Sequence, residues 1–338
     1  MTLRPEGLYC PAGDFFVDPV VPVDKAIITH GHADHARPGH RWIAATRQTL
    51  DIMAIRYGTG FASEIEALDY DVSMQLGDIE VSLHPAGHVL GSAQVRISDG
   101  RLVVVASGDY KRQEDPTCTP FSVVPCDIFI TEATFALPVF RLPSPEGEIA
   151  KLLQSMALFS ERTHMIGAYS LGKAQRVIAL MRQAGYTKTI YVHGALEKLT
   201  EYYRSQNIAL GPVETVDLKA GSYAGELVLC PPGQLSTPWS RRFVDPVTVF
   251  ASGWSRVRAR ARQRGAELPL VISDHAGWED LCRTVLETGA REIWVTHGAE
   301  EALVHWCKNV GLRAFPLNLI GYGDDDDSNP PTPDVNAN

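Results

Sequence analysis

Four histidines and one aspartate lie within thirteen residues in the segment ITHGHADHARPGH (28–40). The apolar run before it predicts a strand that leads into His30. Alternate side chains at the end of an extended strand point the same way, so His30 and His32 can reach one ion. Asp34 and His35 continue through a turn and can reach a second ion. Imidazole and carboxylate are common ligands of borderline divalent metals, so the segment predicts a metal site, and its number of ligands indicates two metals.

Three further ligand candidates stand at the ends of other apolar strands, each next to a glycine. They are His88 in PAGHVLGSA, Asp109 in VVVASGDYK and His297 in WVTHGAEE. Glycine lets the backbone approach closely at such turns. A carboxylate such as Asp109 can bridge two cations through its two oxygens. The recurring combination of a strand end, a ligand and an adjacent glycine therefore predicts that distant parts of the chain complete the site.

The elements that must position these residues alternate between strands and helices along the chain. Apolar, β-rich runs predict strands at 25–29, 79–84, 101–106, 126–131, 164–169, 189–192, 269–273 and 292–296. Periodicity near 3.6 residues predicts helices at 46–57, 146–160, 172–184, 277–288 and 300–310. Such alternation is typical of α/β layers in which helices cover the sheets.

The composition is that of a globular protein. The chain has 338 residues, 45% hydrophobic and 21% charged, which is enough for two domains or one large one. No run of about 18 apolar residues occurs, so we expect no membrane span. The N-terminus lacks a secretory signal, and the six cysteines include no CxxC pair. We therefore expect reduced thiols and a cytoplasmic location.

Charge is distributed unevenly along the chain. The formal net charge is −9, and five acidic groups and no basic ones lie in residues 324–338, whose Pro and Asn content predicts a disordered acidic tail. The stretch 241–264 carries seven arginines against one acidic residue, Asp245. This stretch is either a phosphate-binding patch or a solvated helix face.

The ligand motifs, in their order along the chain, resemble those of the metallo-β-lactamase fold. HxHxDH (30–35), the histidine of GHVLGS, the aspartate of SGDY and the histidine of THG carry this resemblance. It implies an α/β architecture, the αββα sandwich. It also implies that Asp18, from FFVDP, supports the ligand loop from behind.

Two further motifs resemble the β-CASP subfamily, whose members hydrolyse phosphodiesters in RNA or DNA. TEATF gives Glu132 as motif A, ISDHAGW gives His275 as motif B, and His297 is motif C. The resemblance implies a metallo-β-lactamase domain at 1–145 and 270–320, with a β-CASP insert domain at 146–269. Without it, Glu132 could be a surface carboxylate and His275 a helix cap.

Longer stretches are similar to the ligase-associated DNA exonucleases of bacteria. They include GLYCPAGDFFVDP, HPAGHVLGSAQ, GDYKRQEDPTC, YSLGKAQR and FASGWSRVRAR. The resemblance implies a DNA exonuclease in repair, with DNA as substrate and an ATP-dependent DNA ligase and a helicase-related protein as partners. A histidine at motif C is frequent in RNA-processing members, so His297 alone favours the alternative, a β-CASP ribonuclease.

The chemistry expected of this site is two-metal hydrolysis. We expect one ion on His30, His32 and His88. We expect a second on Asp34, His35 and His297, with Asp109 bridging the two. Zinc fits the imidazoles, and manganese is the alternative for activity. Asp34 would also orient the attacking water, while His275, oriented by Glu132, would protonate the leaving oxygen.

Contacts to nucleic acid are expected at two places. Ser170 and Lys173 stand in a turn before a helix, whose free N–H groups can bind phosphate, although a plain helix cap explains them equally well. The other candidates belong to the arginine-rich stretch and are Arg241, Arg242, Arg256 and Arg258. A small-molecule hydrolase such as a lactonase is a third functional class, but Glu132, His275 and the insert count against it. A non-catalytic scaffold is a fourth class. Such a scaffold would lack metal ligands, whereas this sequence retains every expected ligand.

Overall fold

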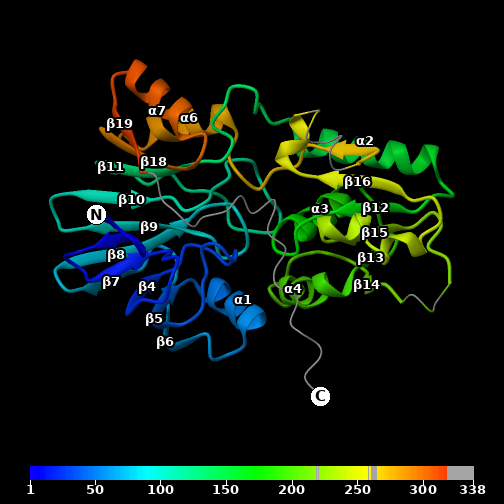
Figure 1. The fold of residues 1–338 in the computed structure, drawn as a ribbon, viewed down its shortest axis with the longest axis horizontal. Helices are drawn as coiled ribbons and strands as arrows, with labels where there is room; N and C mark the ends of the chain where they lie inside the picture. Colours follow the sequence, from blue (N-terminus) through cyan, green and yellow to red (C-terminus); the bar gives the residue numbers. More distant parts are fainter. Residues whose placement is uncertain (218, 220, 258, 260–264, 318–338) are drawn as a thin grey trace.

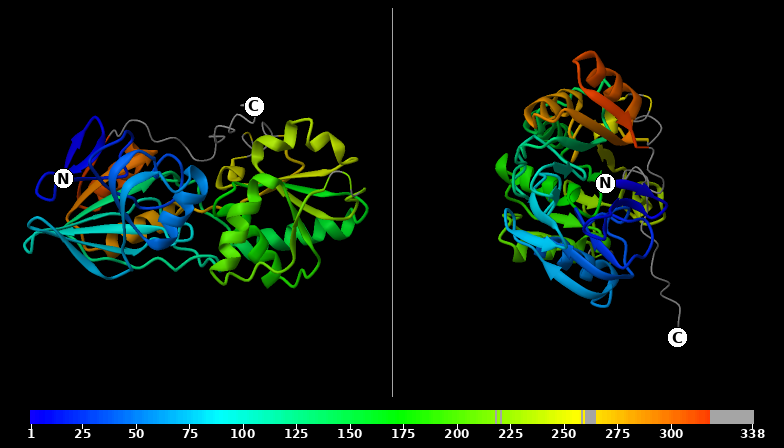
Figure 2. Two further views of the ribbon diagram at one scale, coloured as in Figure 1. Left: turned by 90° about the horizontal axis from the view of Figure 1, so that it is seen from below. Right: turned by 90° about the vertical axis from the view of Figure 1, so that its left-hand side faces the viewer.

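The computed structural model describes residues 1–217, 219, 221–257, 259 and 265–317. The chain forms two lobes that lie side by side, one built on two sheets and the other on a third sheet (Figures 1 and 2). The predicted α/β class is confirmed. The predicted acidic tail and Arg258 lie outside the described residues. No helix in the described ranges has the length and apolar character that a bilayer span requires.

The first lobe packs two sheets face to face. One sheet has the order β1 (Thr2–Arg4), β2 (Gly7–Cys10), β3 (Phe15–Val17), β4 (Lys25–Ile27), β5 (His40–Ala45), β6 (Ala62–Ala67). The other has the order β19 (Arg313–Pro316), β18 (Glu292–Gly298), β11 (Ile128–Ala133), β10 (Val103–Ala106), β9 (Ala93–Ser98), β8 (Ile79–Pro85), β7 (Ser73–Leu76). Val17 and Ile27 of the first sheet share one buried core with Val81, Val95 and Ile130 of the second.

Helices cover the outer faces of both sheets. Leu50 and Met53 of α1 (Arg47–Tyr57) pack on Ile43 of the first sheet. Leu281 of α6 (Trp278–Glu287) and Leu303 of α7 (Glu300–Asn309) belong to the buried cluster of the second sheet. The lobe therefore has the layer order helix, sheet, sheet, helix, since each sheet buries one face against the other and one against helices.

The other lobe, here called the third-sheet unit (145–270), is a parallel sheet. Its order is β14 (Val213–Thr215), β13 (Ile190–Val192), β15 (Leu227–Cys230), β12 (His164–Gly167), β16 (Val247–Ala251), β17 (Leu268–Leu270). The helices α2 (Pro145–Leu158), α3 (Lys173–Gln183) and α4 (Gly194–Ser205) contribute to one buried cluster with this sheet. Three short 3₁₀ helices follow: η1 (Pro232–Ser236), η2 (Ser240–Arg242) and η3 (Gly253–Arg256).

Every predicted strand and helix has an observed counterpart, but more than half of the strands in the described residues were not predicted. The sequence pattern did not single out β5, β15 or β16, nor helix α4. β15 is a four-residue apolar run buried at every position, as is usual for a central parallel strand. Such a run lacks the alternation that identifies a half-buried strand, so periodicity alone cannot reveal it.

A bulge at the end of β18 shapes the edge of the second sheet. Glu132 of β11 pairs with Thr296 and Ala133 pairs with Gly298, so His297 is the extra residue between them. His297 has φ 56°, in the left-handed region that residues other than glycine rarely adopt. Gly298 follows with φ 97°, and a Cβ there would lie 2.4 Å from the carbonyl oxygen of Ala133.

Replacing Gly298 with alanine is therefore expected to destabilise the fold by about 3 kcal/mol, because strained backbone and a steric clash add. Gly289→Ala is the matched control: its φ is also positive at 68°, but nothing lies within 4 Å of the added carbon. That variant should lose only about 1 kcal/mol. Urea unfolding of the two variants measures the difference, and equal losses would contradict the close approach at Ala133.

Candidate metal centre

The predicted ligands gather where strand ends of the two facing sheets meet. Strands β10, β11 and β18 run parallel, so their carboxyl ends lie at one edge of the second sheet. Asp109 follows β10, Glu132 ends β11, and His297 ends β18. The segment with His30 follows β4 of the first sheet, and the backbone N–H of Ala93 in β9 donates to Thr29 at this point. Chain topology thus brings residues almost 270 positions apart to one place.

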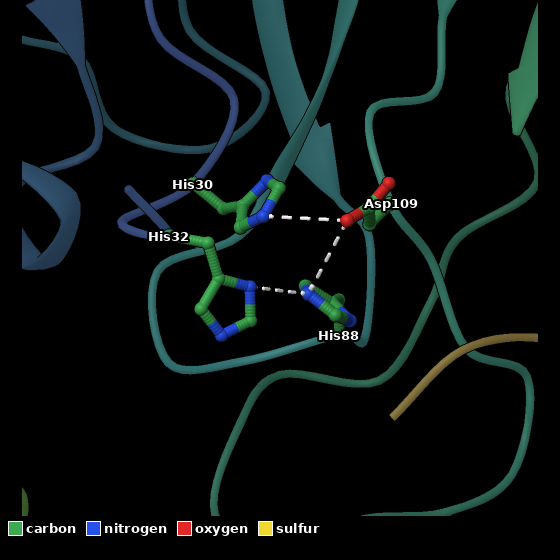
Figure 3. Close-up of side chains that lie close together, drawn as sticks. All are labelled: His30, His32, His88 and Asp109. Atoms are coloured by element: carbon green, nitrogen blue, oxygen red, sulfur yellow. Dashed lines mark hydrogen bonds and ion pairs between the residues drawn. The ribbon is translucent and has the colours of Figure 1, made fainter. Parts of the chain in front are cut away.

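Three imidazoles and one carboxylate form the centre of this gathering (Figure 3). The ligand atoms of His30, His32, His88 and Asp109 lie within 4.8 Å of one another, and all four residues are buried. Asp109 Oδ2 lies 3.5 Å from His30 Nε2 and 3.7 Å from His88 Nε2. His88 Nε2 lies 3.0 Å from His32 Nδ1.

The hydrogen-bond partners decide which imidazole nitrogens carry protons. Nδ1 of His88 lies 2.8 Å from the backbone carbonyl oxygen of Asp274, and Nε2 of His32 lies 3.3 Å from that of Leu171. A carbonyl oxygen can only accept, so these nitrogens donate. When each ring carries a single proton, the facing nitrogens, His88 Nε2 and His32 Nδ1, both present lone pairs and lie 3.0 Å apart. Two such lone pairs repel each other unless a cation lies between them.

The position of the proton on His30 follows from a chain of three hydrogen-bonded groups: His30, Thr29 and Asp18. The Thr29 hydroxyl donates to Asp18 Oδ2 at 2.5 Å, so its oxygen accepts from His30 Nδ1 at 3.0 Å. The lone pair of His30 therefore lies on Nε2, for which no hydrogen-bond partner exists among the described residues. Burial and the neighbouring histidines hold the pKa values of His30 and His88 well below the ordinary range, so both rings are neutral. Neutral imidazoles with converging lone pairs fit a divalent metal ion.

A second group of ligands adjoins the first through Asp109. Nε2 of His35 lies 3.5 Å from Asp109 Oδ2 and 3.6 Å from Asp34 Oδ2. Burial alone would lower the pKa of His35, but Asp109, Asp34 and Asp18 raise it well above the ordinary value. The ring of His297 lies 5.2 Å from that of His35. Several carboxylates surround one buried imidazole, and a second cation would neutralise their excess negative charge.

Asp18 stands behind both groups. Its Oδ1 accepts from the backbone N–H of Thr29 at 2.7 Å, and its Oδ2 lies 2.8 Å from His35 Nδ1. This contact assigns the His35 proton to Nδ1 and directs Nε2 toward Asp109 and Asp34. Asp18 itself has φ 44°, an unusual conformation that places its carboxylate beneath the ligand loop. The geometry suits a supporting carboxylate, and the metal-binding roles of all these residues stay predictions.

Glu132 and His275 form a partly buried pair beside the cluster. Glu132 Oε2 lies 2.9 Å from His275 Nδ1, and Oε1 accepts from the backbone N–H of Tyr110 at 2.7 Å. Glu132 is 1% exposed, so it is not a surface carboxylate. His275 does not cap the next helix, since α6 begins at Trp278 with Gly277 as its cap. The His275 ring lies 4.7 Å from that of His88, and its side chain keeps 15% exposure to solvent.

The candidate nucleic-acid contacts are divided between surface and interior. Arg241 and Arg242 in η2 are exposed, as is Arg256, whose Nε donates to the carbonyl of Val139 at 3.3 Å. Ser170 is half-buried in the turn before α3. Lys173 is only 3% exposed, and its Nζ lies 3.1 Å from Asp274 Oδ2. Its ammonium is held inside the protein, so its placement does not support the predicted phosphate contact.

Sequence reasoning missed a network of buried ions next to the site. Lys111, Asp115, Arg176 and Asp274 are all at most 8% exposed, and they pair with one another or with Lys173. Charged residues are rarely buried to this extent, so composition offers no signal for them. The only hint was position, since Lys111 lies two residues after Asp109 and Asp274 immediately precedes His275.

Comparison with known proteins gives partial matches. No protein-family model matches the chain. A probable DNA ligase of Opitutus terrae is 28% identical over 320 residues, which are 92% of this chain and 30% of that protein. The endoribonuclease ysh1 of Emericella nidulans is 32% identical over 143 residues, 41% of this chain and 16% of that protein. That of Yarrowia lipolytica is 30% identical over 217 residues, 54% of this chain and 25% of that protein.

One of these relatives is named a probable DNA ligase, and two are named endoribonucleases. Within this chain, the buried His/Asp cluster is able to hold a metal ion. The chain spans less than a third of the length of each of these relatives. A solved structure from Enterococcus faecalis V583, titled as a protein of unknown function, superposes with a TM-score of 0.58 at 12% identity, over 89% of this chain and 80% of that one. It shows a shared fold.

Replacing Asp109 with asparagine is expected to weaken divalent metal binding at least tenfold, because its Oδ2 adjoins both groups of imidazoles. Asp71→Asn is the control, since Asp71 makes a comparable contact with His84 (2.6 Å) outside the cluster. Elemental analysis after dialysis against a weak chelator measures the retained metal. Retention of the wild-type amount by Asp109→Asn would contradict the proposed centre.

Proposed function

We propose that this protein is a metal-dependent DNA exonuclease that hydrolyses phosphodiester bonds in DNA repair. The observation that carries the proposal is the convergence of three imidazole lone pairs on Asp109, with the Glu132–His275 pair alongside. The layer order of the first lobe and the parallel sheet of the second support a metallo-β-lactamase αββα sandwich with a β-CASP insert. The proposed boundaries are 1–145 with 270–320, and 146–269.

The two groups of ligands divide the site into two metal positions. The proposed ligands are His30, His32 and His88 at the first position and Asp34, His35 and His297 at the second, with Asp109 between them. When bound, two divalent ions supply a hydroxide at neutral pH and neutralise charge on the phosphoryl oxygens. The imidazole-rich first position suits zinc, and manganese is the alternative ion for activity.

The remaining steps fall to groups of the chain itself. Asp34 adjoins the second position and is proposed to orient the attacking water. His275 is proposed to give a proton to the leaving oxygen of the cleaved ester. Glu132 accepts from its Nδ1, which stabilises the protonated ring and fixes its orientation, as a carboxylate partner does for an acid–base histidine. Positioned acid catalysis of this kind contributes about 10²–10⁴-fold to the rate.

DNA is the favoured substrate because the similarity that covers 92% of the chain is to a protein named a probable DNA ligase. For the same reason, the proposed partners are an ATP-dependent DNA ligase and a helicase-related repair protein. The exposed Arg241, Arg242 and Arg256 would contact the phosphate backbone, which makes binding salt-dependent and indifferent to sequence. A ribonuclease with the same site is the alternative, since the matches of 41% and 54% are to endoribonucleases and His297 occupies motif C.

The decisive assay compares end-labelled single- and double-stranded DNA with RNA of the same sequence, in Zn²⁺ and in Mn²⁺. Mononucleotides released from DNA ends, with circular single-stranded DNA left intact, are the expected result. Asp109→Asn provides the inactive control. Preferential hydrolysis of RNA would replace the proposal with the ribonuclease, and cutting of circular DNA would show an endonuclease.

His275→Ala is expected to slow DNA hydrolysis about 10²-fold or more while its metal content stays at the wild-type level, because it removes a proton donor and no ligand. A nucleotide p-nitrophenyl ester tests the role, since p-nitrophenolate leaves without a proton. The variant should hydrolyse this ester at nearly the wild-type rate. An equal loss on both substrates would contradict proton donation, and loss of metal would make His275 a ligand instead.

A further inference from the structure

The two carbonyl groups that orient the metal-centre imidazoles come from the third-sheet unit or from the segment that leaves it. Leu171, which accepts from His32, lies in the turn between β12 and α3. Asp274, which accepts from His88, lies just after β17, in the segment that returns the chain to the first lobe. The lobe that carries the ligands therefore does not by itself determine which nitrogen of His32 and His88 faces the metal.

The Asp274 side chain is fixed by two cations of α3. Its Oδ2 lies 3.1 Å from Lys173 Nζ, and its Oδ1 lies 3.4 Å from Arg176 Nη1. Lys173 also donates to the carbonyl of Ile272 at 3.0 Å, and Arg176 donates to that of Ser273. Lys173 and Arg176 are three residues apart in a helix, so they present both charges on one face. Together they hold three consecutive residues, 272–274, against α3.

The same network reaches His88 from its other side. Arg176 Nε lies 3.4 Å from Asp115 Oδ2, and Asp115 also pairs with Lys111. Lys111 Nζ in turn donates to the backbone carbonyl of His88 at 3.3 Å. The ring of His88 is thus held through Asp274 and its backbone through Lys111, and both connections meet at Arg176.

Close packing keeps α3 in register with the ligand loop. Gly172, the residue before α3, has φ 83°, and a Cβ there would lie 2.4 Å from Cγ1 of Val89. Val89 directly follows His88, so the start of α3 contacts the ligand loop itself. The hydroxyl of Tyr203 in α4 adds a second contact, since it accepts from the backbone N–H of Leu90 at 3.2 Å.

Stability alone is a weak reason for so many buried charges. Removing two ions from water offsets most of their mutual attraction, and apolar side chains of similar size often stabilise a fold as well or better. Burial by itself would raise the pKa of Asp274, but Lys173, Lys111 and Arg176 hold it well below the ordinary range. The carboxylate is therefore charged and remains bound to its cations, which makes it a rigid point of attachment.

We propose that Lys173 and Arg176 are positioning residues for the metal centre: through Asp274 they hold the carbonyl that places the His88 proton on Nδ1 and leaves Nε2 for the metal. The docked third-sheet unit thereby sets the metal affinity of the three-histidine position. This inference rests on the metal-dependent function proposed above. It assigns Lys173 to the interior of the site and not to the nucleic acid.

The test uses the double variant Lys173→Met with Asp274→Asn in the full chain. It removes a cation and an anion together and nearly preserves side-chain volume, so no unpaired charge is created by design. Zn²⁺ affinity, measured by competition with a chromophoric chelator, is expected to fall about tenfold, the lower end of the range for groups that orient a metal ligand. In the metal-free protein, ¹⁵N shifts of the His88 ring should show that its proton is no longer confined to Nδ1.

Arg162→Met is the matched control, because Arg162 pairs with Asp245 and Glu267 within the third-sheet unit and away from the ligands. It should keep wild-type Zn²⁺ affinity and His88 shifts whatever its thermal stability. Should the double variant not fold, Lys173→Met alone keeps Arg176 on Asp274 and should show about a threefold loss.

Wild-type affinity together with an unchanged His88 tautomer would overturn the positioning role. Failure of the wild-type protein to bind Zn²⁺ or to cleave nucleic acid would instead overturn the proposed function. The tautomer measured in metal-free protein would still test the network in that case, so the two failures are distinguishable.

Discussion

The arrangement of protons on buried imidazoles is the constraint on which the centre depends. Each of His30, His32 and His88 donates from one ring nitrogen to a fixed acceptor, so the other nitrogen presents its lone pair to the same small volume. The acceptors are a hydroxyl already engaged by Asp18 and two backbone carbonyls. None of them can reverse its role, because the hydroxyl proton is committed and carbonyls have none. Acceptors fixed in this way leave converging lone pairs, which fit a divalent cation.

The fold supplies these acceptors from different layers. Asp18 follows β3 in the first sheet, Leu171 lies within the third-sheet unit, and Asp274 lies just after it. Parallel strands of the second sheet bring Asp109, Glu132 and His297 to one edge. Two sheets and an adjacent lobe are therefore needed to define one site. Because the site depends on both lobes, the lobes pack closely against each other at the turns near His88.

Where the signal is local, the sequence identified residues that the structure brings close together. His30, His32, Asp34 and His35 are within six residues, and chain geometry alone keeps them close. Glycines at strand ends also identified His88, Asp109 and His297 as residues expected to lie close together in the fold. The sequence did not reveal that Lys173, a candidate phosphate contact, is buried and paired with Asp274. Burial depends on what packs against a side chain, and a single lysine in a polar turn carries no information about that.

The sequence by itself determined the α/β class, the residue types at the site and the metal chemistry that they favour, because these follow from local pattern and side-chain donor atoms. The tertiary structure alone decided which nitrogen of each imidazole faces inward, since the acceptors lie up to 186 residues away. It also decided that five charged groups would be buried between α3 and the ligand loops. Both depend on which segments meet in space, and hydrogen-bond partners become fixed only when distant elements pack.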